Sequence, residues 1–290
     1  MDKLYKIGPI ILAFQNFPHY NLWPFCEWKL DPYSVNAGNP DIVVKYDVNP
    51  IKPDSTPLHI ESSSQICREI YKLSDGSILW QQLHLPLEEL QLQFVMTQNG
   101  RQITLTYDNT HTLGIGALES LTFMIFYALL YHQILSFHGA LVEEGGNGFL
   151  LCAPSGEGKT THARLWRDYK NALILNGDKA TCFFDGNQWI GFGTPWCGTS
   201  GEYINRQVPI KAIVILSRGI ENQVFPVNEM SLLDYVLPHV LFPNWNRDIT
   251  EKMLSLLDEF LKRIPVLHLQ CTADIQAVDA LKNAMENLSI

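Results

Sequence analysis

The stretch Ala153-Pro-Ser-Gly-Glu-Gly-Lys-Thr160 decides the fold that this sequence predicts. It follows an apolar run, Phe149–Cys152, and opens into a segment with helical character, so a strand, a glycine-rich loop and a helix are expected in that order. Gly156 and Gly158 let the backbone turn its N–H groups toward an anion, and the helix N-terminus adds a favourable dipole. The stretch therefore predicts a phosphate-binding loop.

The spacing is that of a P-loop with Ala153 in the position of the first glycine. Lys159 is suited to bridge the β- and γ-phosphates of ATP, and the Thr160 hydroxyl is suited to bind Mg²⁺. A Gly-rich turn with an exposed lysine is the plainer alternative. The residues assigned to nucleotide binding are Ala153, Pro154, Ser155, Gly156, Glu157, Gly158, Lys159, Thr160 and Thr161.

A carboxylate and a histidine complete the candidate site. Asp178 follows a predicted strand, Ala172–Leu175, and ligands gather at the carboxyl ends of strands in α/β sheets. The alternative is a solvated acid in an Asn-Gly-Asp turn. His138 precedes a strand that is predicted to form a hairpin with Phe149–Cys152, which brings it near the loop. A lone histidine is more often structural.

Bulk composition excludes several function classes. The chain has 290 residues, a formal net charge of -9 and 46% hydrophobic residues, so it has enough apolar residues for a packed core. An acidic chain is a poor candidate for binding nucleic acid or an anionic membrane. The apolar run Leu118–Phe137 contains polar residues and is predicted to be a buried helix, not a membrane span. Six scattered cysteines without metal-ligand spacing fit a reducing cytoplasm.

The character of the chain changes near residue 110. Residues 1–110 are predicted to form a β-rich accessory domain, with Asn99-Gly100 as a hairpin turn, and residues 111–290 an α/β catalytic domain. The second region is predicted to begin with a helix over about 117–135. It is predicted to end with a helix that Asp248 and Glu251 cap and a last helix over 273–287.

Three segments together resemble a known family: His138-Gly-Ala-Leu-Val142, Ala153–Thr160 and Asn176-Gly-Asp178. They are similar to the catalytic domain of HPr kinase/phosphorylase, and more closely to divergent HPr-kinase-like proteins. The resemblance covers about residues 117–216. It implies a P-loop core of the HPr-kinase and phosphoenolpyruvate-carboxykinase type. It also implies His138 as the active-site histidine and Asp178 as the acid that takes the proton from the acceptor serine.

The sequence departs from the family pattern at two places. The family has two adjacent acids after the strand, and here the first position is Gly177. Glu202 is the one carboxylate in the segment Thr194–Arg206, so the expected metal ligands are Thr160, Asp178 and Glu202. Arg206 is expected to contact phosphate or to form a surface salt bridge. In the same segment, Pro195-Trp196 is either a wall or lid for the substrate or an anchor for its loop.

The expected activity is transfer of the γ-phosphoryl group of ATP to a hydroxyl, with Asp178, His138 and Lys159 as the catalytic residues. The expected acceptor is a serine of a peptide or small protein. A small-molecule kinase, for example of free serine, remains open, as does a nucleotide-binding regulator with little turnover. The sequence also leaves the oligomeric state open, a homo-oligomer included.

Overall fold

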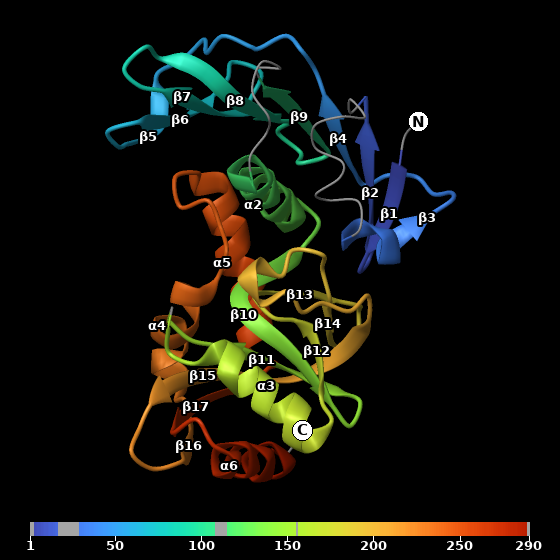
Figure 1. Cartoon of the computed structure of the whole chain (residues 1–290), viewed down its shortest axis with the longest axis vertical. Helices are drawn as coiled ribbons and strands as arrows, with labels where there is room; N and C mark the ends of the chain where they lie inside the picture. The colour runs from blue at the N-terminus through green and yellow to red at the C-terminus, as the bar shows by residue number, and fades with distance from the viewer. Residues whose placement is uncertain (1–2, 17–28, 108–114, 155, 289–290) are drawn as a thin grey trace. The chain divides into compact units, whose positions relative to one another are not determined.

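The computed structural model describes residues 3–16, 29–107, 115–154 and 156–288. The chain divides into two compact units, each with its own sheet. Unit 1 comprises Met1–His132 with Pro243–Thr250, and unit 2 comprises Gln133–Phe242 with Glu251–Ile290. Figure 1 colours the chain along its length and labels its helices and strands.

Unit 1 is built on a nine-stranded sheet with the order β3-β1-β2-β4-β9-β8-β7-β6-β5. Asn99-Gly100 joins β8 to β9, which pair antiparallel, and Gly100 has the positive φ of 68° that such turns favour. The elements are β1 (Lys3–Ile7), β2 (Ile10–Gln15), η1 (Asp31–Tyr33), β3 (Ser34–Val35), β4 (Ile42–Tyr46), β5 (Pro57–Ser62), β6 (Ile66–Lys72), β7 (Ile78–His84), β8 (Glu89–Met96), β9 (Gln102–Tyr107) and α2 (Ile115–Tyr131).

Helix α2 belongs to unit 1 and packs against β8. The compact unit therefore extends to His132, past the boundary near residue 110 that the composition suggested. The helix also ends at Tyr131, four residues earlier than predicted, because Gln133 adopts a left-handed φ of 57° and Ile134 starts the next strand.

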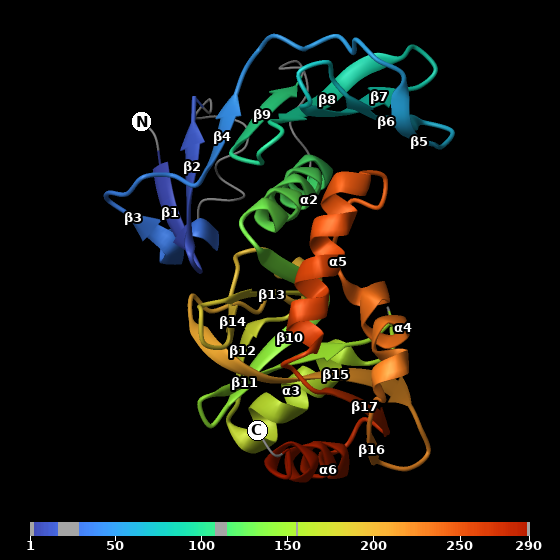
Figure 2. The ribbon, with the colours of Figure 1, turned by 180° about the vertical axis from the view of Figure 1, so that it is seen from behind.

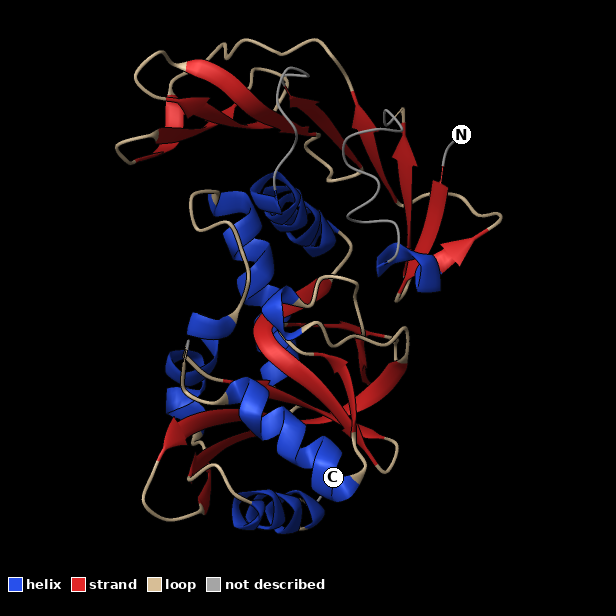
Figure 3. Ribbon diagram, viewed as in Figure 1, coloured by secondary structure: helices blue, strands red, loops and turns tan. Residues whose placement is uncertain are grey.

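Unit 2 contains the remaining elements, which Figure 2 shows from behind and Figure 3 shows by type. They are β10 (Ile134–Glu144), β11 (Asn147–Cys152), α3 (Lys159–Lys170), β12 (Leu173–Asn176), β13 (Lys179–Phe184), β14 (Trp189–Phe192), η2 (Gly198–Ser200), β15 (Gln207–Arg218), β16 (Gln223–Pro226), η3 (Glu229–Ser231), α4 (Leu232–Val236), η4 (Leu237–His239), α5 (Arg247–Leu261, whose first residues belong to unit 1), β17 (Val266–Cys271) and α6 (Ile275–Glu286).

Five strands of unit 2 close into a barrel. The order β11-β10-β13-β14-β15 returns on itself because β15 also pairs with β11. That closing pair is parallel, with Cys152 opposite Ile215, whereas the other four pairs are antiparallel. Strand β17 adds to β15 in parallel. The carboxyl ends of β11, β15 and β17 therefore lie at one edge, and the glycine-rich loop starts there.

Helices α3 and α6 pack against each other and cover one face of the sheet (Figure 3). Trp166 of α3 is fully buried, and its ring lies 4.7 Å from that of Phe149 on β11. Helix α5 contributes Phe260, whose ring lies 5.4 Å from Phe137 and 5.0 Å from Trp189. The buried contact of Trp166 with Phe149 fixes the position of α3 on β11, and thus of the loop before the helix.

The start of α5 corrects one capping prediction. Asn246, not Asp248, caps the helix, because Asn246 Oδ1 accepts a hydrogen bond from Ile249 N at 3.3 Å. Asp248 lies in the first turn and pairs with Lys72 at 3.3 Å. Asn is as good an N-cap as Asp, so the pattern alone did not separate the two positions.

The described ranges contain no helix with the length and hydrophobicity that a membrane span needs. The described cysteines, Cys67, Cys152, Cys182, Cys197 and Cys271, are all free thiols. Burial raises the pKa of Cys152 to about 12 and raises that of Cys182 well above its usual value, which agrees with the prediction that both are buried thiols.

Candidate active site

The glycine-rich loop joins the end of β11 to the start of α3. Gly156 and Gly158 have left-handed φ values of 81° and 99°, and Gly158 is the N-cap of the helix. A Cβ on either would meet nothing within 4 Å, so the loop needs glycine for its backbone conformation and not for space. The first N–H groups of α3 have no side-chain cap, which leaves them available to an anion.

Lys159, His138 and Asp178 meet at this edge of unit 2. Lys159 Nζ lies 3.2 Å from His138 Nε2 and 3.5 Å from Asp178 Oδ1, and His138 Nδ1 lies 3.4 Å from the same carboxylate oxygen. The three residues that the sequence singled out as catalytic therefore form one cluster. Lys179 joins it, with its amino group 2.8 Å from Asp178 Oδ2.

The backbone explains why these residues meet. Gly139 pairs with Cys152 across the β10–β11 hairpin, and Gly139 N donates to Asp178 O at 2.9 Å. A bulge at His138 and Gly139 sets both opposite Lys179 on β13. A Cβ on residue 139 would lie 2.8 Å from Cys152 Sγ, so glycine is required for this close approach.

Asn176 positions Asp178, a role that the sequence did not reveal. Its side chain is fully buried, and its Oδ1 accepts from the backbone N of Asp178 at 2.9 Å and of Lys179 at 2.6 Å. Its Nδ2 donates to Thr194 O at 2.9 Å and Trp196 O at 3.2 Å. The side-chain amide of Asn176 therefore links two segments: the turn that contains Asp178 and the loop that contains Pro195-Trp196.

The tautomer of His138 follows from its partners. The Lys159 ammonium can only donate, so Nε2 of His138 accepts, and the proton of the neutral ring is assigned to Nδ1, facing Asp178. Burial and the charge of Lys159 lower the pKa of His138 below its usual value, although Asp178 acts in the opposite direction. The imidazole is therefore neutral at pH 7.

Burial and neighbouring charges act in opposite directions on the pKa values of Asp178 and Lys159. Burial alone would raise the pKa of Asp178, but the hydrogen bond from Lys179 and the charges of Lys179 and Lys159 outweigh it and lower the pKa. Burial lowers the pKa of Lys159, and Asp178 opposes this shift. Lys159 is 10% exposed and Asp178 is 21% exposed, so the pair is accessible from one side.

The loop from Thr194 to Glu202 closes over Asp178. A Cβ on Gly198 would come within 2.6 Å of Asp178 Cγ, so this backbone packs directly on the acid. Gly177 is equally confined, because a Cβ there would lie 2.7 Å from Ser200 Cβ. Trp196 is half-buried and Cys197 fully buried, so the loop is anchored as well as placed at the site.

The other predicted site residues lie in α3 and in the segment 202–206. Thr160 is half-buried at the start of α3 and Thr161 is exposed; Ser155 lies outside the described residues. Glu202 Oε1 binds Arg167 at 2.5 Å and Arg164 at 3.5 Å, both on α3, whereas its Oε2 is buried without a hydrogen-bond partner. Arg206 pairs with Glu143 at 2.6 Å. Within the described ranges, no three or more His, Cys, Asp or Glu side chains gather as metal ligands.

Two residues near the cluster were missed from the sequence. Phe137 forms an antiparallel bridge with Val240, which places His239 across from His138. His239 is 7% exposed, and burial together with the charges of His138 and Lys159 lowers its pKa. Arg218, at the end of β15, donates to Gly156 O at 2.8 Å. The positions of both residues depend on pairing between segments that are distant in sequence, and no local sequence pattern indicates such pairing.

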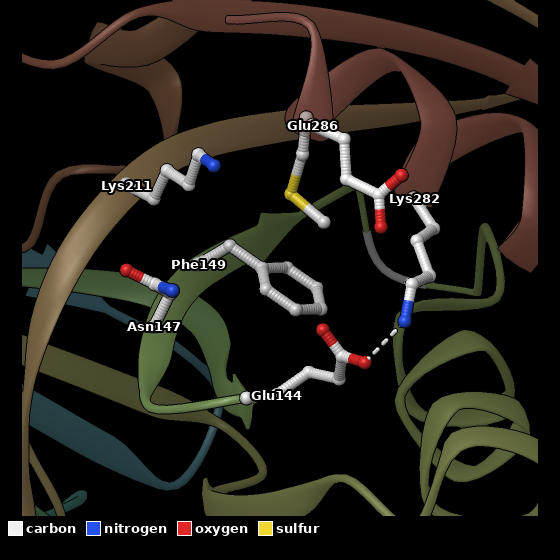
Figure 4. Close-up of a pocket in the computed structure, with 9 residues that line it drawn as sticks. Glu144, Asn147, Phe149, Lys211, Lys282 and Glu286 are labelled. Atoms are coloured by element: carbon white, nitrogen blue, oxygen red, sulfur yellow. Dashed lines mark hydrogen bonds and ion pairs between the residues drawn. The ribbon is translucent and has the colours of Figure 1, made fainter. Parts of the chain in front are cut away.

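A separate cavity of about 160 Å³ lies away from this cluster, at the edge where β11 begins (Figure 4). Phe149 and Met285 provide its apolar part, and Glu144 and Lys282 pair across it at 2.5 Å. Register places it at the far end of β11 from the glycine-rich loop, because Glu144 is opposite Asn147 and Gly139 is opposite Cys152. It is therefore distinct from the candidate active site.

Comparison with known proteins finds two similarities. A family model described as "SynChlorMet cassette protein ScmC" matches residues 104–232, less than half of the chain. Among solved structures, the chain is similar to the HPr(Ser) kinase/phosphatase from Coxiella burnetii, with 11% sequence identity and a TM-score of 0.33. That match covers 53% of this chain and 97% of the other. No curated protein matches the chain.

Proposed function

We propose that this protein is an ATP-dependent kinase that transfers the γ-phosphoryl group to a hydroxyl, with a serine of a peptide or small protein as the acceptor. One observation carries the proposal: Lys159, His138 and Asp178 meet within 3.5 Å of one another directly beside a loop with two left-handed glycines. A phosphoryl-transfer site needs a phosphate cradle, a cation and a carboxylate, and these residues supply all three. We place the protein among the HPr-kinase-like proteins on the same residues.

The loop fits a nucleotide polyphosphate. The uncapped N–H groups of α3 and the Lys159 ammonium are suited to the β- and γ-phosphates. Thr160 and Asp178 would hold Mg²⁺ through the hydroxyl and carboxylate oxygens that this ion prefers. When bound, Mg²⁺ would neutralise charge on the phosphate oxygens.

Asp178 orients the acceptor hydroxyl and takes its proton. The acceptor oxygen forms a bond to the γ-phosphorus, the bond from that phosphorus to the bridging oxygen breaks, and ADP leaves. The lowered pKa of Asp178 keeps the carboxylate ionised, so it can accept a hydrogen bond from the acceptor hydroxyl. Lys159 and the loop amides stabilise the charge that develops on the transferring group.

His138 keeps Asp178 in place. Its Nδ1 proton faces Asp178 Oδ1, and its Nε2 accepts from Lys159, so the ring links the acid to the cation. Because Lys159 is paired with Asp178 Oδ1 in the structure, nucleotide binding would draw the ammonium toward phosphate and free that oxygen for the acceptor, while Lys179 stays on Oδ2. The free thiols fit a reducing compartment such as the cytoplasm.

The decisive experiment measures acceptor-dependent ADP release with Mg²⁺, in wild type and in Asp178→Asn, using serine-containing peptides and free serine. Asp178→Asn should lower turnover by roughly 10² to 10⁴-fold while ATP still binds. Asp185→Asn, an exposed turn residue, is the matched control and should retain turnover. Equal turnover in all three proteins would remove Asp178 from the mechanism.

A nucleotide-binding regulator with little turnover is the second candidate, and one observation favours it. Position 177 lacks the family's first acid, and Ser200 occupies the space that its side chain would need. For a regulator, ATP would bind, no acceptor would stimulate ADP release, and Asp178→Asn would change neither binding nor turnover.

A further inference from the structure

Arg218 reaches from the end of β15 to the glycine-rich loop. Its Nη2 donates to Gly156 O at 2.8 Å, and its Nε lies 3.2 Å from Glu157 Oε2. These contacts are 62 and 61 residues apart in sequence and arise because β15 runs parallel to β11. One guanidinium therefore holds two consecutive loop residues.

The base of Arg218 is fixed while its end is accessible. Its backbone is opposite Cys271 on β17, and Gly219 N donates to Cys271 O at 3.0 Å. The side chain is 74% exposed, so solvent reaches the guanidinium. The sheet, and not packing around the side chain, therefore sets the position of Arg218 relative to the loop.

The loop needs such a partner because it carries two groups that repel an anion. The Gly156 carbonyl has a partial negative charge, and Glu157 adds a full one beside the N–H groups that would bind phosphate. The Glu157 charge therefore repels an approaching polyphosphate. Arg218 satisfies the carbonyl and neutralises the acid.

We propose that Arg218 is a positioning residue for the phosphate loop, holding Gly156 and Glu157 so that the loop accepts a polyphosphate. The inference rests on the proposed function for the identity of the ligand, a nucleoside triphosphate. Arg218 acts through the loop and leaves the transferring group to Lys159 and Asp178. It therefore controls nucleotide affinity and not the rate of the chemical step.

The test measures the affinity of the full chain for Mg·ATP by calorimetry in wild type, Arg218→Ala, Arg218→Lys, Glu157→Gln and the double variant Arg218→Ala/Glu157→Gln. Arg218→Ala should weaken binding roughly five- to tenfold. Glu157→Gln should tighten it about two- to fourfold, and the double variant should recover to within about threefold of wild type. The affinity of Arg218→Lys should lie between those of wild type and Arg218→Ala, because a lysine ammonium cannot bind Gly156 and Glu157 at once as a guanidinium does.

Two further readouts separate positioning from other roles. The kcat at saturating ATP should stay within about twofold in Arg218→Ala, and amide exchange over residues 156–162 should accelerate without ligand. Arg68→Ala, which removes a half-buried arginine paired with Glu61 in unit 1, should change neither.

Several results would overturn the proposal. Unchanged affinity in Arg218→Ala would do so, and so would a double variant as weak as Arg218→Ala. A kcat that falls as far as the affinity would place Arg218 on the transferring group. If wild type binds Mg·ATP but no acceptor stimulates turnover, the kinase function fails while the affinity series still decides the role of Arg218. If wild type does not bind Mg·ATP, the same series with pyrophosphate decides it.

Discussion

The ammonium of Lys159 points at Nε2 of His138 from 3.2 Å, so a cation and not an acid lies on that side of the imidazole. Asp178 lies on the other side, 3.4 Å from Nδ1. The pKa of His138 therefore reports two opposite charges at once, and removing either should move it in a known direction.

Lys159→Met should raise the pKa of His138, because the Lys159 charge lowers it, and Asp178→Asn should lower it further, because the Asp178 charge raises it. Titration of the His138 ring protons by NMR checks both, with His138→Asn to assign the signal. Lys170→Met, which removes an ion pair with Asp279 at the other end of α3, should leave it unchanged. Shifts of the same sign in both variants would contradict the arrangement.

Gly198→Ala should lower turnover at least tenfold. Both Gly198 and Gly201 have left-handed φ values, 57° and 70°, so alanine costs about 1 kcal/mol at either position. Only at 198 does the new Cβ meet Asp178, within 2.6 Å of its Cγ, whereas at 201 nothing lies within 4 Å. Steady-state kinetics of both variants measures the difference, and equal losses would show that loop strain alone is responsible.

Gly177→Asp, which places an acid where the HPr-kinase pattern has its first one, should destabilise the protein by about 1–3 kcal/mol because Ser200 fills the space. Ser200→Gly alone loses the hydrogen bond from Ser200 Oγ to Cys197 O, about 1 kcal/mol. The double variant should be more stable than the sum of the two losses predicts. Urea unfolding of all four proteins gives the coupling, and simple additivity would show that Ser200 is not the obstacle.

His162 should make stability fall in mild acid. It is 3% exposed in α3, neither ring nitrogen has a hydrogen-bond partner, and burial lowers its pKa to about 4 although Asp274 opposes the shift. The unfolded chain binds the proton first, so this contribution is complete above about pH 6.5 and is lost as pH falls toward about 4. Between pH 7 and pH 5 the loss should be about 2 kcal/mol.

His162→Leu removes this titration and keeps an apolar side chain in a helix, so its urea midpoint should change less than that of wild type between pH 7 and pH 5. His84→Leu, at an exposed position of β7, is the control and should retain the wild-type pH dependence. The same pH dependence in His162→Leu would place the titrating group elsewhere.

The cluster around Lys159 was predictable because its signals are local. The glycines of the loop, the apolar strand before it and the hairpin turn at Gly145-Gly146 each specify backbone conformation within a few residues, and together they bring His138 beside the loop. The position of Asp178 followed from the end of a strand in the same way. The role of each residue in catalysis remains a prediction.

The remaining features depend on contacts between distant segments. Arg218 meets the loop because β15 pairs with β11, and His239 meets His138 through the Phe137–Val240 bridge. Glu202 lies in the segment where a metal ligand was expected, but its carboxylate binds Arg167, 35 residues away. Neither composition nor periodicity records which partner a side chain finds across such distances.

The closing of the barrel also constrains the order of events during synthesis. Strand β11 is made long before β15, and β15 long before β17, so the nascent loop emerges from the ribosome without the strand that holds it in place. Until β15 arrives, one edge of β11 is unpaired and apolar, the kind of edge that recruits chaperones or foreign strands. The loop with the candidate catalytic lysine therefore has to wait for a strand that is made about 50 residues later before its neighbouring strand is paired on both sides.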